Sequence, residues 1–432
     1  MVAPLDVGHR FQQASNLALN EVVARRRAAG EPLVHLGFGE SLLPVPPAVR
    51  DWLADGAGRT AYGPVAGDTA VRAAVAGYWE RRRLPTAPEQ IIVAPGSKPL
   101  LMALMAVVDG DVLLPRPSWV TYAPQARLLG RPVHHVPISA RYGGAPDPDA
   151  LRETVRGARR RGGRPRLLIL TLPDNPTGTL APPEAIRRLC AVAADEDLLI
   201  VSDEIYRDLM HSPDLPFLGP AEVAGDRTVV TTGLSKTLGL GGWRIGAARF
   251  PEGPLGAGLR AGVLAVASEV WSTLAGPMQE VATRVFAEPP EITAHVRAGA
   301  RLHGIVTRAV HRIVTAAGAD CRAPDGGFYL YPDFAPVRHR LREHGVTDAE
   351  SLQRHLLDRL GVAVLGGHHF GDTPTALRFR IATSLLHGDD DEQRGLALRS
   401  PAPERLPHVA SALAHLTHAF GTLTAGEGTT PA

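Results

Sequence analysis

The stretch that decides the fold is Leu198-Leu199-Ile200-Val201-Ser202-Asp203-Glu204-Ile205-Tyr206. Its apolar residues follow one another without polar alternation, which predicts a strand covered on both faces. An acidic residue stands directly where this strand ends. Ligands in open parallel sheets bind beyond the carboxyl ends of the strands. The stretch therefore predicts an α/β fold and also a position for a ligand.

Similar apolar runs recur on both sides of this stretch and alternate with helical patterns. This alternation predicts a three-layer α/β architecture, with a largely parallel sheet between two helical layers, in a large domain spanning residues 40–290. The other expected strands are residues 91–94, 111–114, 166–171 and 228–232, and the expected helices between them include 100–108 and 184–195.

After Pro251 the pattern becomes mainly helical and leads into a second unit. We expect a smaller α+β domain made of residues 1–39 and 291–421, with a disordered polar tail at 422–432. The expected helices are 10–30, 260–274, 278–287, 294–317 and 407–420, and the expected strands are 327–331 and 376–381.

Composition narrows the class of protein. The chain has 432 residues, 44% of them hydrophobic, and a net charge of +2, which favours sizeable cores and argues against a dedicated nucleic-acid surface. No apolar run has the length of a membrane helix, and the N-terminus lacks the apolar stretch of a signal peptide. Two cysteines, Cys190 and Cys321, form no CxxC motif, so we expect a reduced, cytoplasmic protein without a metal site.

Lysine is almost absent. Lys98 and Lys236 are the only two lysines among 46 basic residues, and the other 44 are arginines. Arginine supplies a cation anywhere, but its guanidinium stays protonated and cannot act as a neutral amine. Each lysine is therefore a candidate for amine chemistry, although two solvated lysines in an arginine-biased chain remain an alternative.

Both lysines lie near the ends of expected strands. Gly96-Ser97-Lys98 follows residues 91–94 and begins a helix, which favours either a phosphate seat or a plain strand-to-helix turn. Lys236 follows residues 228–232, and Arg244 eight positions later is a natural anion clamp.

Two further motifs stand at strand ends. After residues 198–201, the Asp203 carboxylate and the Tyr206 phenol are placed to contact the nitrogen and the oxygen of one flat heteroaromatic ring. After residues 166–171 comes Asn175-Pro176-Thr177-Gly178, which by itself indicates only a turn.

Together these segments resemble the fold-type I pyridoxal-phosphate enzymes of the class I/II aminotransferase family, related to aspartate aminotransferases. The resemblance extends from about Leu33 to Ser384, most of the chain, and implies that family's three-layer fold. The motifs that carry it, in order, are Tyr62-Gly63-Pro64-Val65-Ala66-Gly67, Gly96-Ser97-Lys98, Pro117-Ser118-Trp119-Val120-Thr121-Tyr122, Asn175-Pro176-Thr177-Gly178, Asp203-Glu204-Ile205-Tyr206, Ser235-Lys236 with Gly242-Trp243-Arg244, and Leu377-Arg378 before Ala382-Thr383-Ser384.

The resemblance implies a role for each matching residue around pyridoxal 5′-phosphate. Lys236 forms the Schiff base with the cofactor aldehyde and later moves the proton between the substrate Cα and the cofactor C4′. Asp203 pairs with the protonated ring nitrogen. Asn175 and Tyr206 hydrogen-bond the ring oxygen, and Trp119 stacks on the ring.

The cofactor phosphate has its own expected set of contacts. They are Gly96, Ser97, Lys98, Ser235 and Arg244, with Lys98 expected to contribute its backbone amide rather than its side chain. Tyr62 matches the tyrosine that crosses to the phosphate of a neighbouring subunit, which implies a homodimer with shared active sites.

The substrate contacts are expected from three positions. Arg378 matches the arginine that binds the substrate α-carboxylate, and its spacing of four to Ala382 favours it over Arg380. Gly39 lines the substrate pocket through its backbone, and Asn175 contributes there as well.

The chain departs from the family pattern at three places. Gly233 stands where a serine is common, which removes one phosphate contact. Arg380 replaces a small residue and either reaches the pocket, where it would recognise a second acidic group or repel basic substrates, or points into the interface, where it would be structural. His368 and His369 lie near the entrance of the small domain and are expected to cap or solvate rather than catalyse.

The resemblance implies an aminotransferase that moves an amino group between an amino acid and a 2-oxo acid. The alternative is a pyridoxal-phosphate-dependent lyase, cyclase or oxidase acting on an amino acid in specialised metabolism, because such enzymes share these residues. A non-catalytic regulator on the same fold is disfavoured because Lys236, Asp203 and Arg378 are all retained. The identity of the amino donor does not follow from these motifs.

Overall fold

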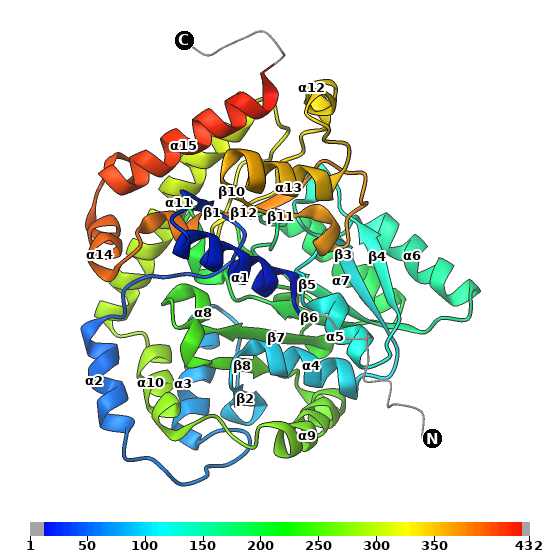
Figure 1. Ribbon diagram of the computed structural model, residues 1–432. Helices are drawn as coiled ribbons and strands as arrows, with labels where there is room; N and C mark the ends of the chain where they lie inside the picture. The colour runs from blue at the N-terminus through cyan, green and yellow to red at the C-terminus, as the bar shows by residue number, and fades with distance from the viewer. Residues whose placement is uncertain (1–12, 426–432) are drawn as a thin grey trace, which may run out of the picture.

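The computed structural model describes residues 13–425, so the expected tail beyond Ala425 and the first twelve residues lie outside the described part. Its centre is a seven-stranded sheet in the order β2-β8-β7-β6-β5-β3-β4 (Figure 1). All neighbouring strands pair in parallel except β8, which is antiparallel to β2 and β7. The predicted largely parallel α/β sheet is confirmed. Its strands are β2 (Ile91–Ala94), β3 (Asp111–Arg116), β4 (Val133–Pro137), β5 (Pro165–Thr171), β6 (Leu199–Asp203), β7 (Thr228–Gly233) and β8 (Gly246–Arg249).

Helices cover both faces of this sheet. Ile92, Leu114 and Val201 pack on one face against α4, α5 and α9. Val93 and Val230 pack on the other face against α2, α3 and α10, while the neighbouring strands on that face meet α6 and α7. Continuous apolar strands are therefore buried from both sides. The helices are α2 (Pro47–Gly56), α3 (Thr69–Glu80), α4 (Ser97–Val107), α5 (Tyr122–Leu128), α6 (Pro148–Arg160), α7 (Pro183–Asp195), α9 (Gly253–Val270) and α10 (Gly276–Phe286). We call this assembly the large unit.

A second assembly, the small unit, surrounds a three-stranded sheet in the order β11-β12-β9. The long helix α11 (Pro290–Ala316) leads into it from the large unit. Its other strands and helices are β1 (Val34–His35), β9 (Tyr329–Leu330), β10 (Val362–Ala363), β11 (Leu365–Gly366), β12 (Phe379–Ala382), α1 (Ser15–Ala28), α12 (Arg338–Glu343), α13 (Ala349–Leu360), α14 (Asp391–Arg399) and α15 (Pro407–Thr424).

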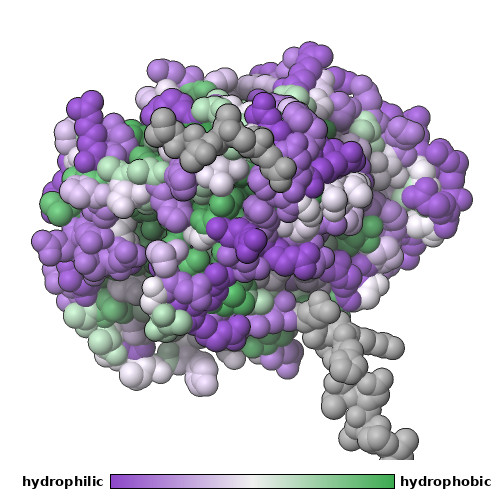
Figure 2. All heavy atoms as spheres, turned by 45° about the horizontal axis from the view of Figure 1, so that its top comes forward, coloured by the Kyte–Doolittle hydropathy of each residue, from purple (hydrophilic) through white to green (hydrophobic). Residues whose placement is uncertain are grey.

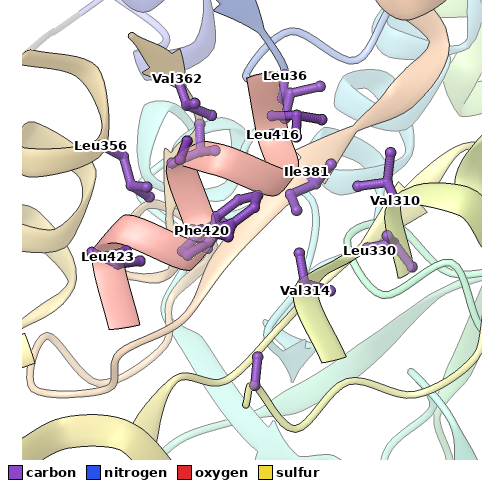
Figure 3. Packing of buried hydrophobic residues seen from close by; sticks show 14 of the residues in the cluster. Leu36, Val310, Val314, Leu330, Leu356, Val362, Ile381, Leu416, Phe420 and Leu423 are labelled. Atoms are coloured by element: carbon purple, nitrogen blue, oxygen red, sulfur yellow. The ribbon is translucent and has the colours of Figure 1, made fainter. Parts of the chain in front are cut away.

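The small unit has its own apolar core, in which side chains of α11, α15 and the short strands meet (Figure 3). Parallel pairing of β1 with β10 ties the N-terminal part of the chain to this unit. The disordered tail was expected to begin at Thr422. This starting point is wrong, because α15 continues to Thr424 and Leu423 is fully buried in the core. The domain boundaries at residues 40 and 290 remain a prediction.

The surface is mainly polar. The face shown in Figure 2 is largely hydrophilic, with apolar residues gathered in small separate patches. Among the described residues, no helix combines the length and the apolar character that crossing a bilayer requires.

Candidate active site

A cavity of about 390 Å³ opens at the carboxyl ends of β5, β6 and β7 and is closed by α1 and the small unit. We call it the catalytic pocket. It lies where the topology of an open parallel sheet places ligands. The predicted residues that line it are Gly39, Ser97, Lys98, Trp119, Asn175, Asp203, Tyr206, Ser235, Lys236 and Arg244.

Lys236 is presented by the single-turn helix α8 (Leu234–Thr237), directly after β7. Its Nζ donates a hydrogen bond of 2.6 Å to the Gly39 carbonyl oxygen. Burial lowers the pKa of this amine to about 8, and the positive charges of Arg380 and Arg244 act in the same direction, while Glu40 opposes them. The site therefore brings a lysine close to the neutral form in which its amine accepts a proton.

Asp203 is the last residue of β6 and is almost completely buried. One carboxylate oxygen accepts from the Tyr122 hydroxyl at 2.8 Å and the other from the Thr231 hydroxyl at 3.1 Å. Burial raises the pKa of this carboxyl to about 6. A buried carboxylate held by two hydroxyls is ready to pair with a cationic N–H group of a ligand.

A chain of polar groups from the loops after β5 and β6 and from β9 lines the same pocket as Asp203. Asn175 donates through Nδ2 to the Tyr206 hydroxyl at 3.3 Å, and this hydroxyl lies 2.8 Å from that of Tyr329. The role of Tyr329 in the pocket was not predicted, because a tyrosine within an expected apolar strand is indistinguishable in sequence from a core residue. A Cβ at Gly39 would overlap the Tyr329 hydroxyl, so this close approach requires glycine.

The first turn of α4 and Arg244 together form an anion seat. Gly96 begins this helix with a φ of +92°, and a Cβ at Gly96 would overlap the Arg244 guanidinium. Arg244 itself has a left-handed φ of 56° and donates to the Gly241 carbonyl oxygen at 2.9 Å. Free N–H groups of a helix start beside a guanidinium favour a bound phosphate.

Gly233 owes its identity to the packing of two strands. A Cβ at this position would lie 2.7 Å from the Ile245 carbonyl oxygen at the start of β8. The backbone of β7 and the chain entering β8 approach too closely here for any side chain. The departure from the family's serine is therefore a consequence of strand packing in this protein.

Besides Arg244, the arginine that lines the catalytic pocket is Arg380 and not Arg378. Arg380 is 1% exposed, donates to Asn175 Oδ1 at 3.2 Å and to the Gly37 carbonyl oxygen at 2.8 Å, and lies over the Tyr329 ring. Of the two possibilities left open for Arg380, the structure shows the one that reaches the pocket.

Arg378 lines a separate cavity and not the catalytic pocket, so the structure does not place it beside the other predicted substrate contacts. Its Nε is 2.8 Å from Asp333 and its Nη1 is 3.2 Å from Asp372. Because positions 378 and 380 have the same parity along the strand, counting residues to Ala382 did not separate them. The Arg378 side chain points toward acidic partners that lie 45 and 6 positions away in the sequence.

The remaining predicted residues lie around the pocket or away from it. Tyr62 is outside the catalytic pocket and 90% exposed. The rings of His368 and His369 lie 3.9 Å apart and do not line the pocket, and burial lowers the pKa of both.

Two side chains at the pocket carry polar groups that the described protein leaves free. Lys98 Nζ lies 5.4 Å from the centroid of the Trp119 ring and makes no hydrogen bond or ion pair to any described residue. Asn16 of α1 lines the same pocket, and its buried Oδ1 has no partner among residues 13–425. The Asn16 side chain had no predicted role, and Lys98 was expected to contribute its backbone amide.

Comparison with known proteins agrees with this geometry. The family model described as "Aminotransferase class I and II" matches residues 31–387. The aspartate/prephenate aminotransferase of Thermus thermophilus is 30% identical over 83% of this chain and 89% of its own length. The aspartate aminotransferase of Bacillus subtilis is 28% identical over 86% of this chain and 92% of its own length.

Solved structures show the same similarity in space. The Thermus thermophilus aspartate aminotransferase with maleate superposes with a TM-score of 0.79 at 26% identity, covering 94% of this chain and 97% of the other. The matched region contains both the large and the small unit. The chain belongs to the aminotransferase class I and II family and is a pyridoxal-phosphate-dependent aminotransferase.

Proposed function

We propose that this enzyme moves the amino group of an acidic amino acid to a 2-oxo acid, with pyridoxal phosphate held in the catalytic pocket. The observation that carries the proposal is the presence of the Lys236 amine, the buried Asp203 carboxylate and the Arg380 guanidinium in one cavity. An amine, a ring-pairing acid and a carboxylate receptor are the three groups that amino-group transfer requires of the protein.

The residues present fit the cofactor. The anion seat at α4 and Arg244 suits its phosphate, and Asp203 suits its ring nitrogen. Tyr206 and Asn175 face the position of the ring oxygen, and Trp119 offers an aromatic face. When bound, pyridoxal phosphate supplies an electron sink for charge that develops at the substrate Cα.

With the cofactor bound, Lys236 would take the proton from the substrate Cα and deliver it to the cofactor C4′, and it would move a proton in the opposite direction in the second half of the cycle. This step needs the neutral amine, which burial favours by lowering the pKa to about 8. The Gly39 carbonyl oxygen, at 2.6 Å from Nζ, holds the amine on the pocket side of α8.

Arg380 binds the substrate α-carboxylate. Its guanidinium is planar, buried and fixed by Asn175 and by the Gly37 carbonyl oxygen, so it presents remaining N–H groups to the pocket in a set direction. A carboxylate bound there places the substrate Cα near Lys236, because both residues line the same cavity.

Lys98 and Asn16 favour a donor with a second carboxylate. The unpaired Lys98 ammonium adds a positive charge beyond those needed for the phosphate and the α-carboxylate. The Asn16 amide lines the same pocket, its Oδ1 has no partner among the described residues, and its NH₂ group is a possible further donor. The names of the relatives support this assignment, since they are aspartate aminotransferases.

We also propose a homodimer in a reducing, cytoplasmic environment. Tyr62 is 90% exposed in one chain, which is costly for an aromatic side chain unless a second subunit covers it. In the dimer its hydroxyl reaches the phosphate bound by the partner subunit.

Both cysteines are free thiols, and burial raises the pKa of each to about 12, which keeps them unreactive.

A single-turnover experiment tests the proposed reaction. Holoenzyme mixed with L-aspartate alone should consume one equivalent per active site and stop, with the cofactor absorbance shifted to that of its amino form. Addition of 2-oxoglutarate should then restore the original spectrum. Continued release of ammonia or uptake of oxygen without an oxo acid would instead support a lyase or an oxidase.

A further inference from the structure

A second cavity of about 320 Å³ lies between the large and the small unit, beside the catalytic pocket. We call it the arginine cleft. The large unit contributes the carboxyl ends of β3 and β4 and the turn after β5, and the small unit contributes the chain before β12 and after α11 (Figure 1). None of the residues that line it also lines the catalytic pocket.

The cleft holds two arginines that lack a partner. Arg378 is neutralised there by Asp333 and Asp372. The guanidinium of Arg116, the half-buried last residue of β3, makes no hydrogen bond or ion pair with any residue of the described chain, and the same holds for the guanidinium of the exposed Arg322. Asp320 is the remaining acid on the wall. Two free guanidiniums facing one cavity provide paired donors for an anion with several oxygens.

Phe370 packs between Tyr331, which lines the cleft, and Arg380, which lines the catalytic pocket. Its buried ring lies 6.0 Å from the ring of Tyr331 in the cleft, and the Arg380 guanidinium lies 5.1 Å from it on the catalytic side. The Phe370 carbonyl oxygen also accepts from the Ser118 amide at 3.0 Å, next to Trp119. A ligand in the cleft is therefore linked to Arg380 through two packed aromatic rings, those of Tyr331 and Phe370.

We propose that the arginine cleft is an effector site for a small multivalent carboxylate, bound by Arg116 from the large unit and by Arg322 from the small unit. The volume is sufficient for a ligand of citrate size. Because these two arginines come from different units, the ligand holds the units together and keeps Phe370 and Arg380 in place. This binding site does not depend on the identity of the amino donor.

Titration calorimetry of the holoenzyme with citrate, at constant ionic strength, tests the site. Wild type should bind citrate in the cleft in addition to any binding in the catalytic pocket. The double variant Arg116→Gln/Arg322→Gln should lose the cleft component by at least tenfold in affinity. The matched control is Arg187→Gln, an exposed arginine of α7 that lines neither cavity and should leave the titration unchanged. Identical titrations of wild type and the double variant would overturn the proposal.

Two further readouts separate the alternatives. Inorganic phosphate should bind the cleft more weakly than citrate, and tighter binding of phosphate would overturn the assignment to a carboxylate.

Citrate should lower the KM for L-aspartate severalfold in wild type, whereas in the double variant it should act only as a competitor. A rise in KM in both proteins would contradict the coupling through Phe370. The single variant Arg322→Gln repeats the test at an exposed side chain whose loss does not endanger folding.

Discussion

Arg378 and Arg380 lie two positions apart and reach different cavities. Arg378 forms ion pairs with Asp333 and Asp372, while Arg380 is buried beside Asn175 in the catalytic pocket. The difference arises from partners that the sequence does not place next to either arginine. A local motif therefore predicted a substrate-binding arginine, and the three-dimensional contacts show which of the two lines the catalytic pocket.

Replacing each arginine separately tests this choice. Arg380→Ala should lower kcat/KM for the amino donor by about a hundredfold or more, since a buried charge-assisted pair with the substrate carboxylate contributes roughly 3 kcal/mol. Arg378→Ala should stay within about fivefold of wild type, because its acidic partners lie outside the catalytic pocket. Arg380→Lys keeps the charge without the planar fork and should fall in between. Equal losses in the two alanine variants would contradict the assignment of Arg380.

Lys98 offers a test of donor class. Lys98→Met should raise the KM for L-aspartate by about tenfold, as expected for a partly solvated ion pair of roughly 1.4 kcal/mol, and leave the KM for L-alanine nearly unchanged. The comparison of the two donors is its own control, because a general loss of cofactor binding would affect both equally. A parallel loss for both donors would show that the Lys98 side chain acts on the phosphate instead.

At the scale of elements, strand propensity was visible only where apolar residues follow one another. The strands β2, β5, β6 and β7 were predicted almost to their ends for that reason. The strands β4 and β8 were not predicted, since one carries two histidines and the other is Gly246-Ala247-Ala248-Arg249. Small residues leave no periodic signal, although β8 is buried over its whole length between β2 and β7.

Gly233, at the end of β7, gives a test of this packing. Gly233→Ala should reduce the free energy of unfolding by about 1–3 kcal/mol, because the added methyl group would press on the Ile245 carbonyl oxygen. Gly258→Ala in α9 is the matched control, since its Cβ would meet open space and helix propensity favours alanine there. Urea unfolding of both variants measures the difference. Equal free energies of unfolding in the two variants would mean that β7 and β8 move apart at little energetic cost.

At the scale of the whole molecule, a buried histidine pair behind the catalytic pocket sets a limit on acid stability. His387 and His303 have rings 4.8 Å apart, and neither ring nitrogen of the fully buried His387 has a partner among the described residues. Burial lowers the pKa of His387 to about 3, with His408 and Arg394 contributing in the same direction. The folded protein therefore holds this histidine neutral where the unfolded chain already binds a proton.

This difference in pKa makes the folded protein less stable as the pH falls. Below the ordinary histidine pKa of about 6.5 the unfolded state binds the proton first, so stability falls by about 1.4 kcal/mol per pH unit down to the folded pKa. His387→Leu should remove this loss and shift acid unfolding, followed by circular dichroism, to lower pH. His418→Leu, an exposed histidine of α15, should leave the transition where it is. An unchanged transition in His387→Leu would show that other groups control acid unfolding.

The division of the chain into units was easier to predict than the contacts between them. The alternating pattern of residues 91–232 indicated the large sheet, and the helical pattern after Pro251 indicated a second unit. The contacts that close the catalytic pocket join residues more than a hundred positions apart, as with Tyr329 and Tyr206 or Arg380 and Gly37. Spacing along the chain carries no information about such pairs.

The central claim is that Lys236 is the one amine that the chemistry requires, and the near absence of lysine makes it directly testable. Borohydride reduction of the holoenzyme fixes the cofactor to the amine that carries it, and peptide mass spectrometry then locates the label. The chain has two lysine side chains, so the pyridoxyl label on a side chain can lie at only two positions. We predict one pyridoxyl label per chain on the peptide that contains Lys236. A label on Lys98, or no label after reduction, would contradict the account.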